Sequence, residues 1–385
     1  MVAAFEKLKI LGPAARFEPA EDVNVVGRAT PAPRVPRDLV DCVSHATLPG
    51  GRRIPMLKTL VSSVCENDCR YCAFRSGRDM RRATFQPDEL ARLSYQLWHQ
   101  GVVKGVFLSS GVVNGGPTTQ DRIIATAEIL RRRYHFPGYL HVKIMPGADR
   151  DQVAETMRWA DRVSINLEAP NQARLADLAP AKLFSEQLLT RLTWAHELRR
   201  STVGRRPSLS TQFVVGAIGE SDLELLVTSS HLYSELKLAR AYFSGFRPVP
   251  NTPLEAHPAN DDRRERRLYQ ASFLLRDYDF DVEELPFDSA GALPLDVDPK
   301  LAWAKQNLVE RPVEVNAADR RTLMRIPGVG PISADRILRA RREGTLRELK
   351  QLHAFGVQVK RAAPYVLLAG RSLPRQLSLW SVATP

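Results

Sequence analysis

Three cysteines lie close together early in the chain. Cys65, Cys69 and Cys72 are spaced as CxxxCxxC within the segment VCENDCRYC. Asn67 and Asp68 favour a loop here, because their short polar side chains stabilise turns. Thiolates in such a loop are typical ligands of iron-sulfur clusters. Four thiolates are usual, so three would leave one iron of a 4Fe-4S cube open to nitrogen and oxygen donors of a substrate or cofactor.

A zinc site is the alternative, because three cysteines and one histidine also form a closed tetrahedral site. No histidine closely follows Cys72 in the sequence, and zinc motifs favour a two-residue gap between paired ligands. We therefore expect an iron-sulfur cluster. The fourth cysteine, Cys42, stands apart and is interpreted as a small, partly buried thiol. Four cysteines in 385 residues are too few for a disulfide scaffold, which favours a reducing, cytoplasmic location.

Short apolar segments alternate with longer segments of helical period from about residue 52. The predicted strands are 55–62, 105–110, 140–145, 162–169, 209–217 and 237–246. The predicted helices include 87–100, 122–134, 185–200 and 220–236. This alternation predicts an α/β fold with a parallel sheet, a partial (β/α)6 barrel. Reactive groups gather at the carboxyl ends of barrel strands, and the cysteines directly follow the first predicted strand.

The cysteine motif resembles that of the radical S-adenosylmethionine (radical SAM) superfamily, in which an aromatic residue precedes the third cysteine, as Tyr71 does here. The resemblance implies two cofactors, a 4Fe-4S cluster and S-adenosyl-L-methionine. It implies that one electron from the cluster cleaves S-adenosylmethionine and that the resulting 5'-deoxyadenosyl radical removes hydrogen from a substrate. A flavodoxin or a ferredoxin is the expected electron donor.

Further residues are candidates for binding S-adenosylmethionine. Where the superfamily often has Gly-Gly-Glu, whose backbone binds the methionine amine, this chain reads Ser109-Ser110-Gly111, and an ordinary loop remains an alternative. The segment GAIGESD, which begins at Gly216, resembles a superfamily motif that contacts adenine. The candidate cofactor-binding residues are Tyr71, Ser109, Ser110, Gly111, Lys143, Ser164, Asn166, Glu168, Gly216 and Arg240.

Three of these candidates alternate along one predicted strand. Ser164, Asn166 and Glu168 share one face, which would be the inner face of a barrel, where ribose hydroxyls or a carboxylate would be their partners. A solvated edge strand would show the same alternation. Lys143 and Arg240 are candidates to pair with the cofactor carboxylate, with outward-pointing charges as the alternative.

The net charge of +12 favours an anionic partner such as nucleic acid. Residues 313–385 hold thirteen basic and five acidic side chains, a net charge of +8. Apolar runs are too short for a membrane span, and charged residues interrupt the N-terminal segment, which argues against a signal peptide. We therefore expect a cytoplasmic protein with no membrane partner.

The basic C-terminal region contains the motif IPGVG between two helical segments. Gly328 and Gly330 would leave backbone N–H groups open at the start of the second helix, where the helix dipole favours a phosphate. Leu323, Ile326, Ile332, Ile337 and Leu338 are expected to pack the two helices together. The segment resembles the helix-hairpin-helix family of DNA-binding modules, some of which bind proteins instead. The candidate DNA-binding residues are Gly328, Gly330, Arg325, Arg336 and Arg339.

The predicted organisation has five parts. They are an extended N-terminal arm (1–50) with Pro31, Pro33 and Pro36, a radical SAM partial barrel (51–256), a helical extension and linker (257–312), a small all-α helix-hairpin-helix domain (313–371) and a tail (372–385). A barrel followed by such a hairpin resembles the radical SAM proteins of DNA modification or repair that are linked to uracil-DNA glycosylase-like partners. The resemblance implies action on DNA. Modification of tRNA or rRNA, and a non-catalytic iron-sulfur protein that binds DNA or senses redox state, remain alternatives.

Overall fold

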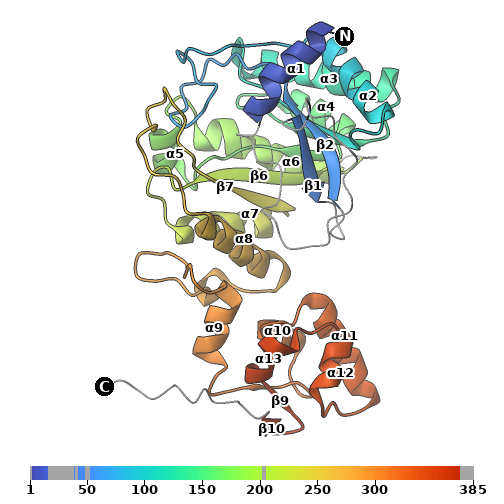
Figure 1. The fold of residues 1–385 in the computed structure, drawn as a ribbon, viewed down its shortest axis with the longest axis vertical. Helices are drawn as coiled ribbons and strands as arrows, with labels where there is room; N and C mark the ends of the chain where they lie inside the picture. Colours follow the sequence, from blue (N-terminus) through green and yellow to red (C-terminus); the bar gives the residue numbers. More distant parts are fainter. Residues whose placement is uncertain (1, 16–38, 40–41, 48–52, 202–204, 373–385) are drawn as a thin grey trace. The chain divides into compact units, whose positions relative to one another are not determined.

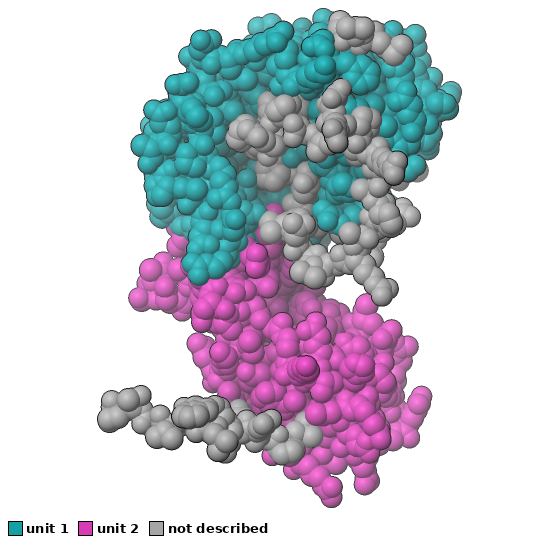
Figure 2. All heavy atoms as spheres, in the orientation of Figure 1, with its two compact units in different colours: residues 1–220, 231–265 teal, residues 221–230, 266–385 magenta. Residues whose placement is uncertain are grey.

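The computed structural model describes residues 2–15, 39, 42–47, 53–201 and 205–372. The chain divides into two compact units, residues 1–220 with 231–265 and residues 221–230 with 266–385 (Figure 2). Residues 266–312, expected to be a helical extension and linker, thus belong to the same unit as the terminal module. None of the described helices is long and apolar enough to cross a bilayer.

The first unit is built on a seven-stranded sheet whose strands lie side by side in chain order. The strands are β1 (Val43–Thr47), β2 (Arg53–Leu60), β3 (Gly105–Ser109), β4 (Tyr139–Lys143), β5 (Arg162–Ser164), β6 (Ser208–Val215) and β7 (Arg240–Gly245). The neighbouring pairs β1 with β2 and β6 with β7 can be seen in Figure 1. Strand β1 is antiparallel to β2, and all later neighbours pair in parallel. The six predicted strands and their parallel order, as in a partial barrel, are confirmed.

Helices follow the strands along the chain. They are α2 (Pro87–His99), α3 (Gly115–Glu128), η2 (Ile129–Arg133), α4 (Arg150–Trp159), α5 (Gln172–Leu178), η3 (Phe184–Leu189), α6 (Thr190–Ser201), α7 (Asp222–Glu235) and α8 (Asp262–Asp277). Of these, α2, α3, α4 and α6 pack against one another in that order. Strands β2 and β6 are buried along almost their whole length. Burial on both faces is typical of a parallel sheet and explains the continuous apolar runs.

The N-terminal region differs from the prediction. Helix α1 (Val2–Ala15) and strand β1 replace part of the expected extended arm, so that prediction is wrong for these residues. Pro31, Pro33 and Pro36, on which the prediction was based, lie outside the described residues.

Strand β5 is shorter than expected, because its ladder ends at Ser164 rather than at residue 169. Glu168 has a φ of 67°, a left-handed conformation that is uncommon for residues other than glycine. A single bridge still joins it to Phe213 of β6. The chain therefore leaves regular strand geometry just where it reaches the carboxyl edge of the sheet.

The second unit combines helices with a small sheet. Its elements beyond α8 are η4 (Val282–Glu284), α9 (Pro299–Asn307), β8 (Val313–Glu314), α10 (Arg320–Arg325), α11 (Pro331–Glu343), α12 (Leu349–Ala354), α13 (Val359–Ala362), η5 (Ala363–Tyr365), β9 (Val366–Leu368) and β10 (Arg371–Ser372). The expectation of an all-α domain is corrected by these three short strands, which form one sheet.

One apolar core fills this unit. Leu323, Ile326 and Ile337 are buried in it, as predicted, and Leu338 packs against it. Ile332 is instead 70% exposed, so its predicted packing role is wrong. It is the second residue of α11 and points away from the core that the rest of that helix covers. Ala304 and Leu308 also belong to this core, which explains why residues before 313 fold with the terminal module.

Candidate active site and candidate nucleic-acid interface

The loop after β2 carries the three cysteines at the carboxyl edge of the parallel sheet. Cys65, Cys69 and Cys72 all line one pocket. The backbone N–H of Val112 lies 3.4 Å from Cys65 Sγ, and that of Phe74 lies 3.4 Å from Cys72 Sγ. N–H groups directed at sulfur stabilise thiolates, so these contacts favour the thiolate form of both end cysteines.

An arginine that the sequence did not single out holds this irregular loop together. The Arg82 guanidinium donates to the carbonyl oxygens of Ser63 at 2.5 Å, Phe74 at 3.0 Å and Arg75 at 2.8 Å. Buried carbonyl groups outside regular structure need such donors. Arg82 therefore fixes the path of the chain on both sides of the cysteines.

Gly111 allows the loop after β3 to approach the cysteine loop. A Cβ atom at this position would lie 2.2 Å from the Val64 carbonyl oxygen and 3.0 Å from Cys65 Cβ. The Gly111 N–H donates to the carbonyl oxygen of Ser62 at 2.7 Å. Only glycine fits between these backbone segments without a shift.

We expect Gly111→Ala to lower the iron bound by the purified protein severalfold, because the added methyl group displaces the backbone beside Cys65. Iron and sulfide analysis after anaerobic reconstitution measures this. Gly344→Ala is the matched control, since a Cβ there meets nothing within 4 Å. Full iron content in Gly111→Ala would show that this close approach is not needed.

The pocket is partly open, and about 1100 Å³ of space, including the part continuous with solvent, lies within it. The predicted residues in its wall are Cys65, Cys69, Tyr71, Cys72, Ser110, Gly111, Lys143, Asn166 and Glu168. They come from the carboxyl ends of β2, β3, β4 and β5, which meet at one edge because the strands are parallel.

Four predicted residues do not line this pocket: Ser109, Ser164, Gly216 and Arg240. The Ser164 hydroxyl lies 2.9 Å from His141 Nε2, deeper in the sheet. The Gly216 N–H donates to Glu220 Oε1 at 2.5 Å. Arg240 is the first residue of β7, at the amino end of the strand, and its guanidinium lies over the Tyr242 ring. Arg240 therefore lies at the amino edge of the sheet, away from the pocket at the carboxyl edge.

Lys182 is a pocket residue that the sequence did not reveal. Its Nζ donates to Glu168 Oε1 at 2.9 Å, and the Tyr71 hydroxyl donates to Glu168 Oε2 at 2.7 Å. Only 7% of Lys182 and 2% of Glu168 are exposed. Lys182 follows α5 in an irregular stretch without a recognisable motif, so only the fold brings it to the pocket.

Burial and charge act in opposite directions on this network. Burial alone would raise the pKa of Glu168, but Lys182 and Lys143 lower the pKa below its usual value. Burial would lower the pKa of Lys182, but Cys69 and Glu168 raise it. The pair is therefore charged. Burial raises the pKa of the Tyr71 hydroxyl, and the Glu168 carboxylate raises it further.

Burial also raises the pKa of the Cys69 and Cys72 thiols. Without a metal these thiols are protonated near neutral pH, so ligation by thiolates must release protons. Among the described residues, no three His, Cys, Asp or Glu side chains converge closely enough to hold a single metal ion. A cubane differs from such a site, because each of its irons takes a separate thiolate.

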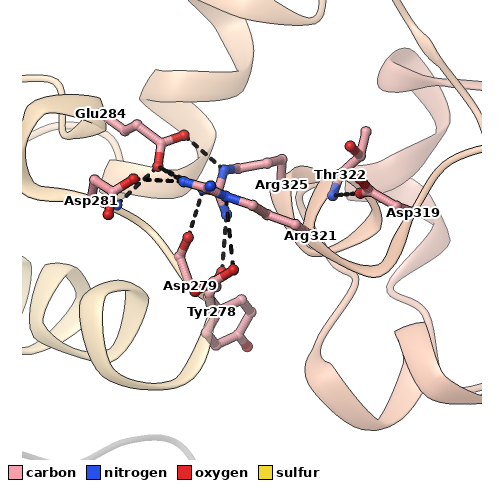
Figure 3. A network of polar contacts seen from close by, with 8 residues as sticks. All are labelled: Tyr278, Asp279, Asp281, Glu284, Asp319, Arg321, Thr322 and Arg325. Carbon is pink, nitrogen blue, oxygen red and sulfur yellow. Dashed lines mark hydrogen bonds and ion pairs between the residues drawn. The ribbon is translucent and has the colours of Figure 1, made fainter. Parts of the chain in front are cut away.

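The second unit contains the five candidate DNA-binding residues, but one of them, Arg325, is buried and cannot contact a phosphate. Arg325 is only 4% exposed, and its guanidinium pairs with Glu284 at 2.6 Å (Figure 3). It also donates to the carbonyl oxygens of Tyr278 at 2.9 Å and Asp279 at 2.7 Å. Its guanidinium carbon lies 3.8 Å from the centre of the Phe280 ring. The prediction that Arg325 binds phosphate is corrected, because the side chain is buried in a structural network.

The hairpin between α10 and α11 is shaped by Gly328. This residue has a φ of +87°, and a Cβ atom would lie 2.6 Å from the Gln358 carbonyl oxygen. The Gln358 N–H donates back to the Gly328 carbonyl at 3.0 Å, so the hairpin packs on the turn before α13. Gly330 is the N-cap of α11, where the first N–H groups have no intrahelical acceptor. Arg336 and Arg339 are both exposed on α11.

Residues 59–229 match the family model of the Radical SAM superfamily. An uncharacterized protein of Methanocaldococcus jannaschii is 24% identical over 217 residues, which cover 54% of this chain and 53% of that protein. The chain thus spans about half the length of this curated relative.

Solved structures with low similarity include three proteins. The FeFe-hydrogenase maturase HydG is 15% identical with a TM-score of 0.46, and the match covers 56% of this chain and 48% of HydG. Methylornithine synthase is 13% identical with a TM-score of 0.46, and the match covers 56% of this chain and 60% of the synthase. The radical S-adenosylmethionine methyltransferase TsrM of Kitasatospora setae is 16% identical with a TM-score of 0.39, and the match covers 54% of this chain and 39% of TsrM.

Proposed function

We propose that this chain, which contains a radical SAM superfamily domain over residues 59–229, is an enzyme that acts on DNA in modification or repair. One observation carries the proposal. A cysteine pocket in the first unit is joined, within one chain, to a second unit with a glycine hairpin and exposed arginines. The first unit would perform the reaction, and the second would bind the backbone of the nucleic acid.

The cofactors of the radical SAM superfamily are a 4Fe-4S cluster and S-adenosylmethionine, and the pocket fits them. Cys65, Cys69 and Cys72 would hold the cluster. The buried Ser110 Oγ lines the pocket without a hydrogen-bond partner among the described residues, so a bound ligand would satisfy it. When bound, the two cofactors supply one-electron cleavage of S-adenosylmethionine.

The remaining pocket residues would hold and orient S-adenosylmethionine. The buried Lys143 would pair with its carboxylate, and Asn166 and Glu168 would offer polar groups to its ribose hydroxyls. The Gly111 backbone lies beside the cysteine loop, where the methionine amine would bind. Apolar wall residues such as Ile144 and Val214 would exclude water, which protects a reactive radical from side reactions.

The catalytic part of the proposal is tested with reconstituted protein under anaerobic, reducing conditions. We expect formation of 5'-deoxyadenosine, increased by duplex DNA, and a new nucleoside detected by mass spectrometry of that DNA. Stimulation by structured RNA alone would favour tRNA or rRNA modification instead. A loaded cluster that never cleaves S-adenosylmethionine would favour the non-catalytic iron-sulfur protein. A uracil-DNA glycosylase-like protein is the partner we would test by co-purification.

The second unit would bind phosphates through the exposed arginines and the N-terminus of α11. We expect Arg336→Ala combined with Arg339→Ala to weaken binding to duplex DNA about equally for all sequences. The slope of log affinity against log salt should fall by about 2, because each lost phosphate contact removes about one unit. Fluorescence anisotropy at several salt concentrations measures both effects.

Arg92→Ala combined with Lys104→Ala is the matched control, because it removes the same charge from exposed residues of the first unit. This control should leave the salt slope nearly unchanged. An equal fall of the salt slope in both double variants would mean that DNA affinity depends only on the net charge of the protein. That result would argue against the hairpin as the binding surface.

A further inference from the structure

The buried ion pair of Glu168 and Lys182 lies in the pocket wall beside the cysteine loop. Its two residues come from different segments, Glu168 from the end of β5 and Lys182 from the stretch between α5 and η3. The Tyr71 hydroxyl, which donates to Glu168 at 2.7 Å, ties the pair to the chain between Cys69 and Cys72. The carboxylate is thus fixed from two sides.

Lys182 lies in the wall of the pocket that the three cysteines line. The N–H of the preceding residue, Ala181, donates to Oδ1 of Asp68, the residue before Cys69, at 3.3 Å. The positive charge of Lys182 is therefore held beside the cysteine loop. Because both members of the pair are buried, solvent ions screen this charge weakly.

We propose that Lys182, held in place by Glu168, is a positioning residue whose fixed positive charge raises the reduction potential of the 4Fe-4S cluster on the cysteine loop. Reduction adds one negative charge to the cluster, so a nearby cation stabilises the reduced form more than the oxidised form. The carboxylate of Glu168 partly opposes this effect. The inference rests on the proposed cluster but not on DNA as the substrate.

The test is a potentiometric titration of the full-length reconstituted protein, without S-adenosylmethionine or DNA. One electron from the mediator solution converts the oxidised cluster to the paramagnetic reduced cluster, which is quantified by electron paramagnetic resonance. At a fixed potential, we expect Lys182→Met to lower the ratio of reduced to oxidised cluster about tenfold, a shift of about 59 mV to lower potential for a one-electron couple. Glu168→Gln should shift the potential in the opposite direction.

Two further variants separate charge from structure. Lys182→Arg keeps the charge and should restore a potential near that of the wild type. Lys143→Met removes another pocket lysine, which lies at the end of β4 rather than on the segment that bonds to Asp68, and should produce a smaller shift. A merely structural role for Lys182 would instead give variants with equal potentials and different iron contents.

An unchanged potential in Lys182→Met would overturn the inference. If that variant fails to bind iron, Glu168→Gln decides, because a potential equal to or below the wild-type value contradicts the charge model. Failure of the wild-type protein to bind a cluster would instead refute the proposed function. The two failures are therefore distinguishable before any turnover is measured.

Discussion

Cys69→Ala is expected to reduce 5'-deoxyadenosine formation to background and to prevent assembly of an intact 4Fe-4S cluster. Cys69 is the most deeply buried of the three loop cysteines and lies in the pocket wall next to Lys182. Losing its thiolate leaves one iron of the cluster without a protein ligand. Iron analysis and product chromatography after anaerobic reconstitution measure the two effects.

Cys42→Ala provides the matched control for this experiment. Cys42 is also buried, but its thiol lies 3.7 Å from the Leu8 carbonyl oxygen, and it does not line the pocket. This variant should keep its full iron content and activity. Retention of both by Cys69→Ala would refute the role of the loop, whereas their loss in Cys42→Ala would mean that cysteine replacement acts through general instability.

Arg325→Ala is expected to destabilise the second unit by about 3 kcal/mol, because it removes a buried, charged hydrogen-bond donor. The substitution removes one guanidinium partner of Glu284, which keeps its contact with Arg321 at 3.2 Å, and frees the Tyr278 and Asp279 carbonyl groups (Figure 3). Hydrogen exchange should therefore accelerate throughout residues 278–343 of the full-length protein. Exchange in the sheet of the first unit should stay nearly unchanged.

Arg336→Ala distinguishes stability from binding. Arg336 is exposed on α11, so its loss should change stability by less than about 0.5 kcal/mol and should act mainly on affinity for DNA. The two arginines are thus expected to give opposite patterns. If Arg325→Ala weakened DNA binding while hydrogen exchange stayed as in the wild type, Arg325 would reach a phosphate rather than Glu284.

The alternation of apolar strands and helices was readable from the sequence because it depends on local periodicity. Each of the six predicted parallel strands appears in the sheet, with ends that differ by a few residues. Strand ends were less predictable, since they depend on pairing with the neighbouring strands of the sheet. Arg240 illustrates the consequence, because it is the first residue of β7 and so lies at the amino edge of the sheet, away from the pocket at the carboxyl edge.

Residue type alone could not show whether an arginine is exposed to solvent or satisfies buried backbone carbonyl groups. Arg82 and Arg325 resemble exposed basic residues in the sequence, yet each satisfies buried carbonyl groups in the structure. Whether a guanidinium faces solvent or backbone depends on segments distant in the chain. Arg325 is buried by residues 278–284, more than forty positions earlier.

The sequence alone determined the three thiolates, because their spacing on one loop is a local property of the chain. It also determined the strand order of the sheet that carries this loop, through periodicity. Only the tertiary structure decided which charges surround the thiolates. Tyr71 and Glu168 are 97 positions apart, and Lys182 joins them because parallel strands bring their carboxyl ends, and the loops that follow, to one edge.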